Sequence, residues 1–422
     1  MELKPGYKQT EVGIIPEDWD TSNLESISLV PMQNGLFYEP KRKGRGVYLV
    51  NVGDMYTAAP ISIETLDLFD ATTSQIQTFC AQEGDLFFTR SSVVPSGIAY
   101  CNILPDCKGA DVVFDSHLIR VRANPNIMDA RFLYLNCLAM HSRKYLVSSA
   151  KTATMTTIDQ GALKKCPVFV PPLSEQRAIA TALSDVDALL EGLDRLIAKK
   201  RDLKQAAMQQ LLTGKTRLPG FKGEWEVKRL GDIIEKLVGG GTPSRGNQAF
   251  WGNEIPWVTV KDFATFHPRQ TQESITKIGL NNSASHLIPA GTLITSTRMA
   301  LGKAVVYEVD VAINQDLKAI FLKPTASVQF LYYWFEHNAQ MIDELGSGST
   351  VKGISINELR GIPFPHLPLS EQTAIATVLS DMDAEIAALE NRRNKTKDIK
   401  QAMMQELLTG KTRLVKIGGS NA

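Results

Sequence analysis

The chain contains one long segment twice. Residues 172–218 begin PLSEQRAIATALSDVDALLEGLD and end KQAAMQQLLTGKTRL, and residues 368–414 begin PLSEQTAIATVLSDMDAEIAALE and end KQAMMQELLTGKTRL. The two segments align without a gap at an offset of 196 residues, with 30 identities in 47 positions. Repetition at this level indicates a duplication, and it constrains the fold before any local motif does. The chain is therefore expected to fold as two related halves.

The duplication continues upstream of each segment at lower similarity. The matching pairs of ranges are 17–27 with 223–233, 84–90 with 291–298, allowing one inserted residue, and 112–125 with 311–324. Each half thus joins a diverged domain to a nearly invariant segment. The expected boundaries are 1–171 for the first domain, 172–218 for the first helical segment, 219–367 for the second domain, 368–414 for the second helical segment and 415–422 for a tail.

Each repeated segment is predicted to form one long helix with a single apolar seam, because its apolar residues recur at intervals of four and three positions. The seam residues are Ile179, Leu183, Val186, Leu190, Leu193 and Ile197, then Ile375, Leu379, Met382, Ile386 and Leu389. Ser174 and Ser370 are expected N-caps, and Gly214 and Gly410 are expected C-terminal stops. About 40 residues would span roughly 60 Å. The seams favour a coiled-coil-like pair, antiparallel or parallel, over packing of each helix on its own domain, and the antiparallel arrangement is the one predicted.

The diverged domains show short alternating strands, broken by glycine and proline, and one late helix each. Strands are expected at 47–56, 84–92, 117–124, 255–263, 291–299 and 317–324, and helices at 130–146 and 329–345. This mixture is typical of an α+β fold. Two pseudo-symmetric α+β domains separated by paired helices are therefore the predicted fold.

Basic and hydroxyl-bearing residues gather in the loops of both domains. The loop at 41–45 is compactly basic, and GGGTPSR at 239–245 is expected at the equivalent place of the second domain. Arginine at a strand end beside Ser or Thr can make bidentate contacts to guanine edges or phosphates. Solvated turns are the alternative, but an arginine at the same point of the same strand in both domains favours binding. The candidate DNA contacts are Lys41, Arg42, Lys43, Arg45, Arg90, Ser91, Thr242, Ser244, Arg245, Lys261, Thr297, Arg298 and Lys303.

Other classes of protein are disfavoured by what the sequence lacks. The net charge of +1 argues against a globally basic binder, although local basic surfaces remain possible. The Gly-Lys-Thr of LLTGKTRL has Gln209 and Gln405 where a phosphate-binding loop requires glycine, and it ends a helix instead of beginning one. No histidine or cysteine has metal-ligand spacing. No secretory leader or long apolar run is visible, so a cytoplasmic protein without membrane spans is expected.

Four motifs give the chain a resemblance to a known family. They are the two PLSEQ…LLTGKTRL segments, GGGTPSR followed by WGNEIPWVTVKD, Thr297-Arg298 with Gly302-Lys303, and Ile313-Asn314-Gln315-Asp316 before a strand. With these motifs the chain resembles, along nearly all its length, the specificity subunit of a type I restriction–modification enzyme. The first half keeps the same frame but has Phe114-Asp115-Ser116-His117 at the last motif.

The resemblance implies a non-catalytic subunit with two target-recognition domains, each reading one half of a split, asymmetric site in double-stranded DNA. It also implies that the helices set the gap between the half-sites and dock methyltransferase (M) subunits, through which restriction (R) subunits join the complex. No cofactor is expected in this chain, and S-adenosylmethionine, ATP and Mg²⁺ are expected on the partner subunits. A stand-alone DNA methyltransferase or nuclease, and a helical scaffold that reads no DNA, are the alternatives.

Overall fold

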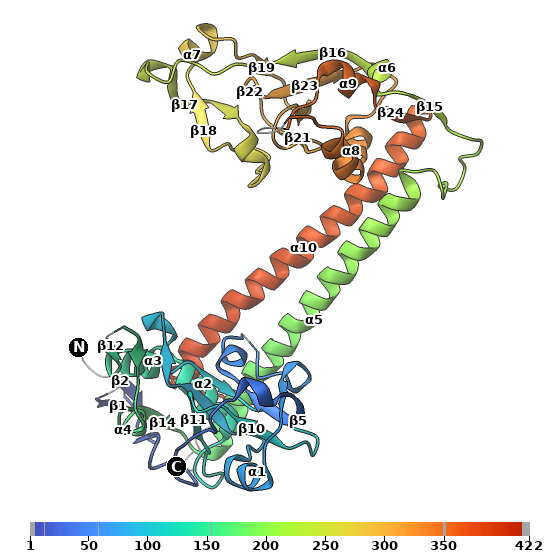
Figure 1. Cartoon of the computed structure of the whole chain (residues 1–422). Helices are drawn as coiled ribbons and strands as arrows, with labels where there is room; N and C mark the ends of the chain where they lie inside the picture. The colour runs from blue at the N-terminus through green and yellow to red at the C-terminus, as the bar shows by residue number, and fades with distance from the viewer. Residues whose placement is uncertain (1–4, 12, 58, 153, 349–351, 416–422) are drawn as a thin grey trace, which may run out of the picture. The chain divides into compact units, whose positions relative to one another are not determined.

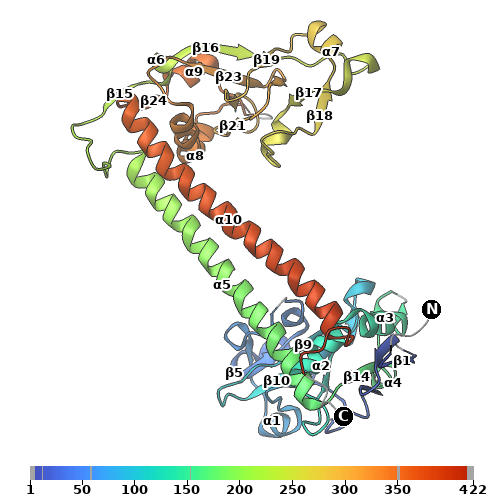
Figure 2. The same ribbon diagram turned by 180° about the vertical axis from the view of Figure 1, so that it is seen from behind.

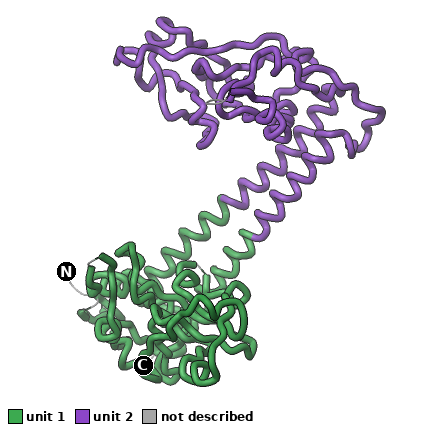
Figure 3. The backbone as a smooth tube through the Cα atoms, viewed as in Figure 1, with its two compact units in different colours: residues 1–194, 391–422 green, residues 195–390 purple. Residues whose placement is uncertain are grey.

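The computed structural model describes residues 5–11, 13–57, 59–152, 154–348 and 352–415. The chain forms two compact units (Figure 3): unit 1 comprises residues 1–194 and 391–422, and unit 2 comprises residues 195–390. Both long helices contribute to both units, so each unit combines one diverged domain with parts of the two repeated segments. The boundaries predicted from the sequence divide the chain differently, since they separate each diverged domain from its helix, and they stay a prediction.

Unit 1 holds the first diverged domain (Figure 1). Its strands are β1 (Tyr7–Thr10), β2 (Gly13–Pro16), β3 (Asp20–Asn23), β4 (Gln33–Asn34), β5 (Lys43–Val50), β6 (Asp67–Phe69), β7 (Leu86–Thr89), β8 (Ser91–Ser92), β9 (Cys101–Ile103), β10 (Val112–Phe114), β11 (Leu118–Val121), β12 (Lys151–Thr152), β13 (Thr156–Thr157) and β14 (Pro167–Val170). Its shorter helices are α1 (Thr73–Phe79), α2 (Ala130–Leu138), α3 (Met140–Ser148) and α4 (Gln160–Lys164).

Unit 2 holds the second diverged domain. Its strands are β15 (Glu226–Arg229), β16 (Ile234–Gly239), β17 (Trp251–Val258), β18 (Glu273–Ile275), β19 (Leu287–Ile288), β20 (Leu293–Ser296), β21 (Ala304–Val306), β22 (Val311–Ile313), β23 (Leu317–Leu322) and β24 (Pro363–His366). Its shorter helices are α6 (Leu230–Ile233), α7 (Lys277–Asn281), α8 (Val328–Glu344) and α9 (Ile356–Gly361).

The two units share their sheet topology. The sheet order β4-β11-β7-β9 of unit 1 corresponds to β16-β23-β20-β21 of unit 2. In a second sheet, β5 pairs parallel with β10 and antiparallel with β6, and β17 pairs in the same senses with β22 and β18. The antiparallel pair β3-β14 likewise has its counterpart in β15-β24. The duplication therefore includes the diverged domains, and their α+β class is confirmed.

The late helix differs between the units. In unit 2 it is continuous as α8, whereas in unit 1 the predicted helix is broken at Ala139, which has φ −67° and ψ 154°. Buried Asn136 lies just before the break, and its Oδ1 is 3.0 Å from Nε2 of His141 and 3.4 Å from Oγ of Ser142. Both contacts join α2 to α3 across the break and so hold the bent arrangement.

The repeated segments form α5 (Leu173–Leu211) and α10 (Leu369–Leu407), with 39 residues each. The carbonyl of Pro172 accepts hydrogen bonds from the next turn of α5, and Pro368 does the same for α10. Prolines therefore occupy the N-cap positions, and the prediction of Ser174 and Ser370 as caps is wrong because both lie in the first turn. The expected stops have the left-handed backbone that glycine favours, with φ +71° at Gly214 and +70° at Gly410.

Within each unit α5 and α10 run side by side and antiparallel (Figure 1, Figure 2). In unit 1 the ion pairs Lys400–Asp187 (2.5 Å) and Arg393–Asp194 (3.2 Å) link the helices. In unit 2 the corresponding links are Lys200–Glu385 (2.7 Å), Lys204–Asp383 (2.8 Å) and Arg201–Glu390. From Asp187 to Lys204 of α5 the α10 partner shifts from Lys400 to Asp383, as antiparallel pairing requires.

The apolar seams serve two packing functions. Ile179 and Leu183 are fully buried in the core of the unit 1 domain, together with Leu407 and Leu408 from the end of α10. Ile375 and Leu379 join the core of unit 2 in the same way. The other seam residues are buried at Leu193, Ile197 and Ile386 and half-buried at Val186, Leu190, Met382 and Leu389. Each seam thus contacts both its own domain and the other helix.

The end of each repeated segment is bound to the start of the other one. In unit 1, Arg413 donates to both carboxylate oxygens of Glu175 at 2.6 Å, and Trp19 Nε1 donates to the same carboxylate at 2.9 Å. The Arg413 guanidinium lies 5.8 Å from the Trp19 ring centroid. We call this set of Trp19, Glu175 and Arg413 latch 1. It shows that residues near the C-terminus complete the N-terminal domain.

Latch 2 in unit 2 repeats this arrangement with Trp225, Glu371 and Arg217. Arg217 donates to Glu371 at 2.5 and 2.6 Å, and Trp225 Nε1 lies 3.3 Å from the same carboxylate. A Cβ at Gly214 would lie 3.0 Å from the Trp225 ring. The glycine therefore ends the helix and also lets the tryptophan approach.

Candidate nucleic-acid interface

In unit 2, a chain of polar contacts connects the 239–245 loop to Arg298. Thr242 Oγ1 donates to Gln315 Oε1 at 2.6 Å, and Gln315 Nε2 lies 3.5 Å from Asp316 Oδ2. Asp316 is buried, and its Oδ1 forms an ion pair with Nη1 of Arg298 at 3.5 Å. The Arg298 side chain remains 58% exposed, so it is positioned by the carboxylate but still open to a ligand.

Arg245 is held on an aromatic and acidic surface of unit 2. Its guanidinium lies 3.9 Å from the Trp251 ring centroid and hydrogen-bonds Glu273, with one contact at 2.9 Å. This hydrogen bond raises the pKa of Arg245 and lowers the pKa of Glu273. Trp251 Nε1 donates to the Ser244 carbonyl at 3.1 Å and so fixes the loop. Because exposed ion pairs stabilise a fold little, Arg245 can exchange Glu273 for a phosphate or a base edge.

The remaining predicted contacts of unit 2 differ in their accessibility. Lys261 and Lys303 are exposed and form no ion pair among the residues that the structure describes. Thr297 is buried, and its Oγ1 donates to the Asp316 carbonyl at 3.1 Å. The structure therefore argues against Thr297 as a DNA contact and gives it the role of holding Asp316 beside Arg298.

The basic loop of unit 1 is largely neutralised by its own domain. Half-buried Arg42 donates to the Asp70 carbonyl at 2.9 Å and to Gln75 Oε1 at 2.8 Å. Arg45 pairs with the Asp70 carboxylate at 2.8 Å. The hydrogen bond from Lys43 to Asp67, at 2.7 Å, raises the pKa of that lysine. Of the four predicted cations, Lys41 is exposed and has no ion pair among the described residues.

The expected equivalence of the 41–45 and 239–245 loops is wrong. Gly35 and Gly240 are the true counterparts, because a Cβ would lie 1.9 Å from the Phe114 oxygen at the first and 1.8 Å from the Ile313 oxygen at the second. The register of β5 on β6 and of β17 on β18 makes Lys43 the counterpart of Trp251. The 239–245 loop therefore corresponds to the stretch that begins near Gly35, and its second copy is longer.

The predicted equivalence of Arg90 and Arg298 is also wrong, by one residue. Arg90 N donates to the His117 carbonyl at 2.8 Å, and Thr297 N makes the same 2.8 Å bond to Asp316. Arg298 therefore corresponds to half-buried Ser91. Since neighbouring residues of a strand point to opposite faces, the two arginines are not in equivalent positions. Arg90 is nevertheless exposed, without a side-chain hydrogen bond or ion pair to the residues that the structure describes.

Three residues of the unit 2 surface were not predicted as site residues: Trp251, Glu273 and Gln315. Each of them orients a predicted contact, but none of them is basic, so the pattern of arginine beside serine or threonine does not include them. The sequence signal for this site is Trp251, which follows the glycine-rich loop containing Arg245, because aromatic rings stack on guanidinium groups.

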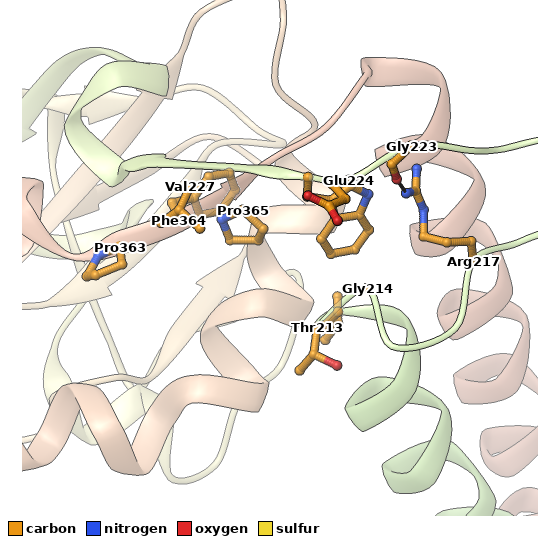
Figure 4. Close-up of a pocket in the computed structure, with 11 residues that line it drawn as sticks. Thr213, Gly214, Arg217, Gly223, Glu224, Val227, Pro363, Phe364 and Pro365 are labelled. Atoms are coloured by element: carbon orange, nitrogen blue, oxygen red, sulfur yellow. Dashed lines mark hydrogen bonds between the residues drawn. The ribbon is translucent and has the colours of Figure 1, made fainter.

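One cavity of unit 2 lies beside the repeated Gly-Lys-Thr segment. A cavity of about 450 Å³ beside the end of α5 is lined by Gly214, Trp225 and Phe364, with Arg217 bound to the Gly223 carbonyl (Figure 4). The Gly-Lys-Thr segment follows the helix here, as predicted. In the described part of the chain no group of three His, Cys, Asp or Glu residues is placed to hold a metal ion. None of the described helices is long and apolar enough to cross a membrane.

The fold and this surface define a class of protein: two α+β domains of one topology, each with a loop edge suited to binding, attached to paired helices. A family model for the type I restriction modification DNA specificity domain matches residues 16–199 and again residues 222–398. The chain belongs to this family, and its two copies of the domain are the target-recognition domains of a type I specificity subunit.

Individual relatives agree along the chain. It is 26% identical to a putative type I restriction enzyme MjaX specificity subunit of Methanocaldococcus jannaschii, over 97% of both chains. It is 28% identical to the EcoR124I/EcoR124II specificity subunit of Escherichia coli, over 52% of this chain and 56% of that one.

Solved structures share the fold. The HsdS subunit from Thermoanaerobacter tengcongensis matches with a TM-score of 0.51 and 18% identity, over 94% of this chain and 98% of that one. The type I S subunit from M. genitalium matches with a TM-score of 0.59 and 14% identity, over 96% and 98%. These comparisons give no support to a stand-alone methyltransferase, a nuclease or a scaffold that reads no DNA.

Proposed function

We propose that each target-recognition domain reads one half of a bipartite, asymmetric DNA site. The observation that carries this proposal is a contrast at one topological position. In unit 2 the edge after β20 carries Arg298 beside Asp316, whereas in unit 1 the edge after β7 carries Ser91 and two exposed valines. Two domains with the same topology but different side chains at this position are suited to reading two different base sequences.

A domain exchange tests this modular function. Residues 219–367 would be replaced by the second domain of another specificity subunit that keeps a tryptophan at the position of Trp225, because latch 2 requires it. The expected result is a methylated site with one new half and one unchanged half. A change in both halves, or in neither, would contradict independent reading. An exchange within 1–171 is the matched control and should alter the other half.

The helices are proposed to set the gap between the half-sites. Their support is that α5 and α10 are single uninterrupted helices that both continue from one unit into the other. Inserting residues into 172–218 should change the gap and leave both half-sites as they are. An altered half-site sequence would refute this role.

The helices are also proposed to dock two copies of a methyltransferase subunit. Each unit combines the first part of one repeated segment with the last part of the other, so both units can present a similar set of surface residues. Exposed positions with equivalent residues in both copies include Asp185 and Asp381, Lys199 and Lys395, Leu203 and Ile399, and Gln209 and Gln405. A repeated surface that keeps an exposed apolar residue is suited to the same partner twice.

The stoichiometry of the complex tests this docking surface. Leu203→Glu should remove one methyltransferase subunit, and the double variant with Ile399→Glu should remove both, as measured by native mass spectrometry. Leu196→Glu is the matched control, since this exposed leucine is replaced by Arg392 in the other copy. Normal stoichiometry in the double variant would place the docking surface elsewhere.

Catalysis is proposed to lie in the partners. In this proposal methyltransferase subunits hold S-adenosylmethionine, and restriction subunits that join the complex hold ATP and Mg²⁺, in the cytoplasm. The support is the specificity-subunit name of the relatives and the lack of a metal-binding cluster in the described residues. Methyl transfer by the purified chain with S-adenosylmethionine alone would refute the proposal.

A further inference from the structure

A loop in unit 1 presents two valines to solvent. It runs from Ser92 to Ala99, after β8, and Val93 is 81% exposed while Val94 is 55% exposed. Two adjacent aliphatic side chains exposed to water at a loop tip contribute no burial energy to their own domain. Exposed apolar surface of this kind commonly marks a binding site, so we expect an apolar partner.

Side-chain hydrogen bonds from Ser92 and Arg143 to the loop's backbone carbonyls hold the loop in one conformation. Ser92 Oγ donates to the Val94 carbonyl at 2.7 Å. Arg143 donates to the Ala99 carbonyl at 2.6 Å and to the carbonyls of Ser96 and Ile98 at 2.9 Å. Such fixation lowers the entropy that the valines would lose on binding. The loop is therefore preorganised for contact.

The backbone at the end of the loop is strained. Ala99 is fully buried and has φ +47°, a left-handed conformation that costs a residue with a Cβ of order 1–3 kcal/mol. Its amide donates to the Thr89 carbonyl at 3.0 Å, so the strain closes the loop back onto β7. A conformation of this kind persists only where surrounding contacts hold it, as the bonds from Arg143 do here.

The valines border a hollow of about 600 Å³ that is open to solvent. Its other lining residues include Tyr56 and Met155, both exposed in part, and His117. The Tyr56 hydroxyl donates to the Gly97 carbonyl at 3.3 Å. The hollow is thus apolar at the valine tip and polar toward His117.

The position of the loop in the fold points to DNA as its partner. It follows β8 (Ser91–Ser92), directly after Arg90, and in unit 2 the counterpart of Ser91 at this edge is Arg298. Exposed Arg90 supplies a positive charge that suits a phosphate beside an apolar base contact. Among the groups on base edges, the C5-methyl of thymine is the apolar one, and it lies in the major groove.

We propose that Val93 and Val94 read a thymine C5-methyl group in the half-site of unit 1. The valine methyl groups would pack on the thymine methyl while Arg90 contacts the neighbouring backbone. Unit 1 then discriminates by apolar contact, whereas unit 2 discriminates with the Arg298 edge. This inference rests on the proposed function.

Deoxyuridine substitution tests the inference, because it removes the methyl group and leaves base pairing intact. The full chain in complex with its methyltransferase partner would be titrated with duplexes in which each thymine of the unit 1 half-site is replaced in turn. That half-site is the one left unchanged by exchange of residues 219–367. At one position or more, affinity should fall about three- to tenfold, as expected for losing a buried methyl contact.

A double variant links the effect to the loop. Val93→Ser with Val94→Ser should bind thymine and uracil duplexes equally, while discrimination in the other half-site stays as it was. Val227→Ser, a change at a 74% exposed valine of β15, is the matched control and should keep the preference for thymine.

Four results would overturn the inference while leaving sequence-specific binding intact. They are a half-site without thymine on either strand, binding that is indifferent to every uracil, a uracil effect that persists in the double variant, and loss of methyltransferase binding by that variant in the absence of DNA. The last would assign the valines to a protein interface. Loss of all sequence preference in the unaltered complex would instead contradict the proposed function itself.

Discussion

Latch 1 should be a major source of stability for unit 1, and replacing Arg413 by methionine tests it. Glu175 is 1% exposed, and its carboxylate is neutralised by Arg413 at 2.6 Å. In Arg413→Met the chain length at this position is preserved, but Glu175 keeps only the 2.9 Å hydrogen bond from Trp19. Breaking a buried pair by removing one partner costs about 3–5 kcal/mol, because the remaining charge stays desolvated.

Amide hydrogen exchange measures this effect in one unit at a time, which a global unfolding curve of a two-unit chain does not. In Arg413→Met, peptides from β3, β14 and the start of α5 should lose protection, and those of unit 2 should not. Arg217→Met is the matched variant and should act only in unit 2. Adding Glu175→Gln to Arg413→Met should recover part of the loss, because no unpaired charge is left.

If Arg413→Met lowered the stability of unit 1 by less than about 1 kcal/mol, the reasoning would be refuted, because a buried carboxylate without its ion-pair partner destabilises a fold by more than that. An equal loss of protection in both units would also refute it, since every group of latch 1 belongs to unit 1.

Three other changes probe different parts of the chain. Burial lowers the pKa of His141 to about 4 from 6.5, so the unfolded chain takes up the proton first. The His141 contribution to the stability of unit 1 should be complete above pH 6.5 and fall by up to about 3 kcal/mol toward pH 4, and His141→Gln should remove it, as measured by amide hydrogen exchange in unit 1. Arg298→Ala should relax specificity at one base pair by about 1–3 kcal/mol in competition binding, whereas a uniform loss with a shallower salt slope would mark a phosphate contact. Arg42→Ala should destabilise unit 1 by about 1–3 kcal/mol without changing the DNA site, while Lys41→Ala should leave its stability within about 0.5 kcal/mol by the same hydrogen-exchange measurement.

The long helices and the doubling of the fold could be predicted because their determinants are local. The spacing of the seam residues and the glycines at 214 and 410 act within a few turns of helix. The orientation of the pair was favoured correctly, but its cause is not local: Lys400 meets Asp187 and Lys204 meets Asp383 only after the chain has folded.

The details of the candidate interface depend on strand register, which follows from contacts between segments distant in the sequence and so could not be predicted from local patterns. An alignment with one gap between Gly291 and Thr297 pairs Arg90 with Arg298, yet β7 and β20 correspond without any gap, and Arg90 is equivalent to Thr297. The ion pairs that neutralise the basic loop at 41–45 could not be predicted for the same reason. Asp70 lies 25 residues after Arg45 and reaches it through the pairing of β5 with β6.

The latches explain why LLTGKTRL is the same in both copies while the loops differ. Each latch takes its arginine from the end of one copy and its glutamate from the start of the other. A change in either copy alone would leave a buried carboxylate without its partner in one unit. The glycine is constrained as well, because a Cβ at Gly214 would crowd Trp225 and a Cβ at Gly410 would clash with Pro16 and crowd Trp19. The loops carry no such mutual constraint, so each domain was free to acquire its own edge, with valines in unit 1 and Arg298 in unit 2.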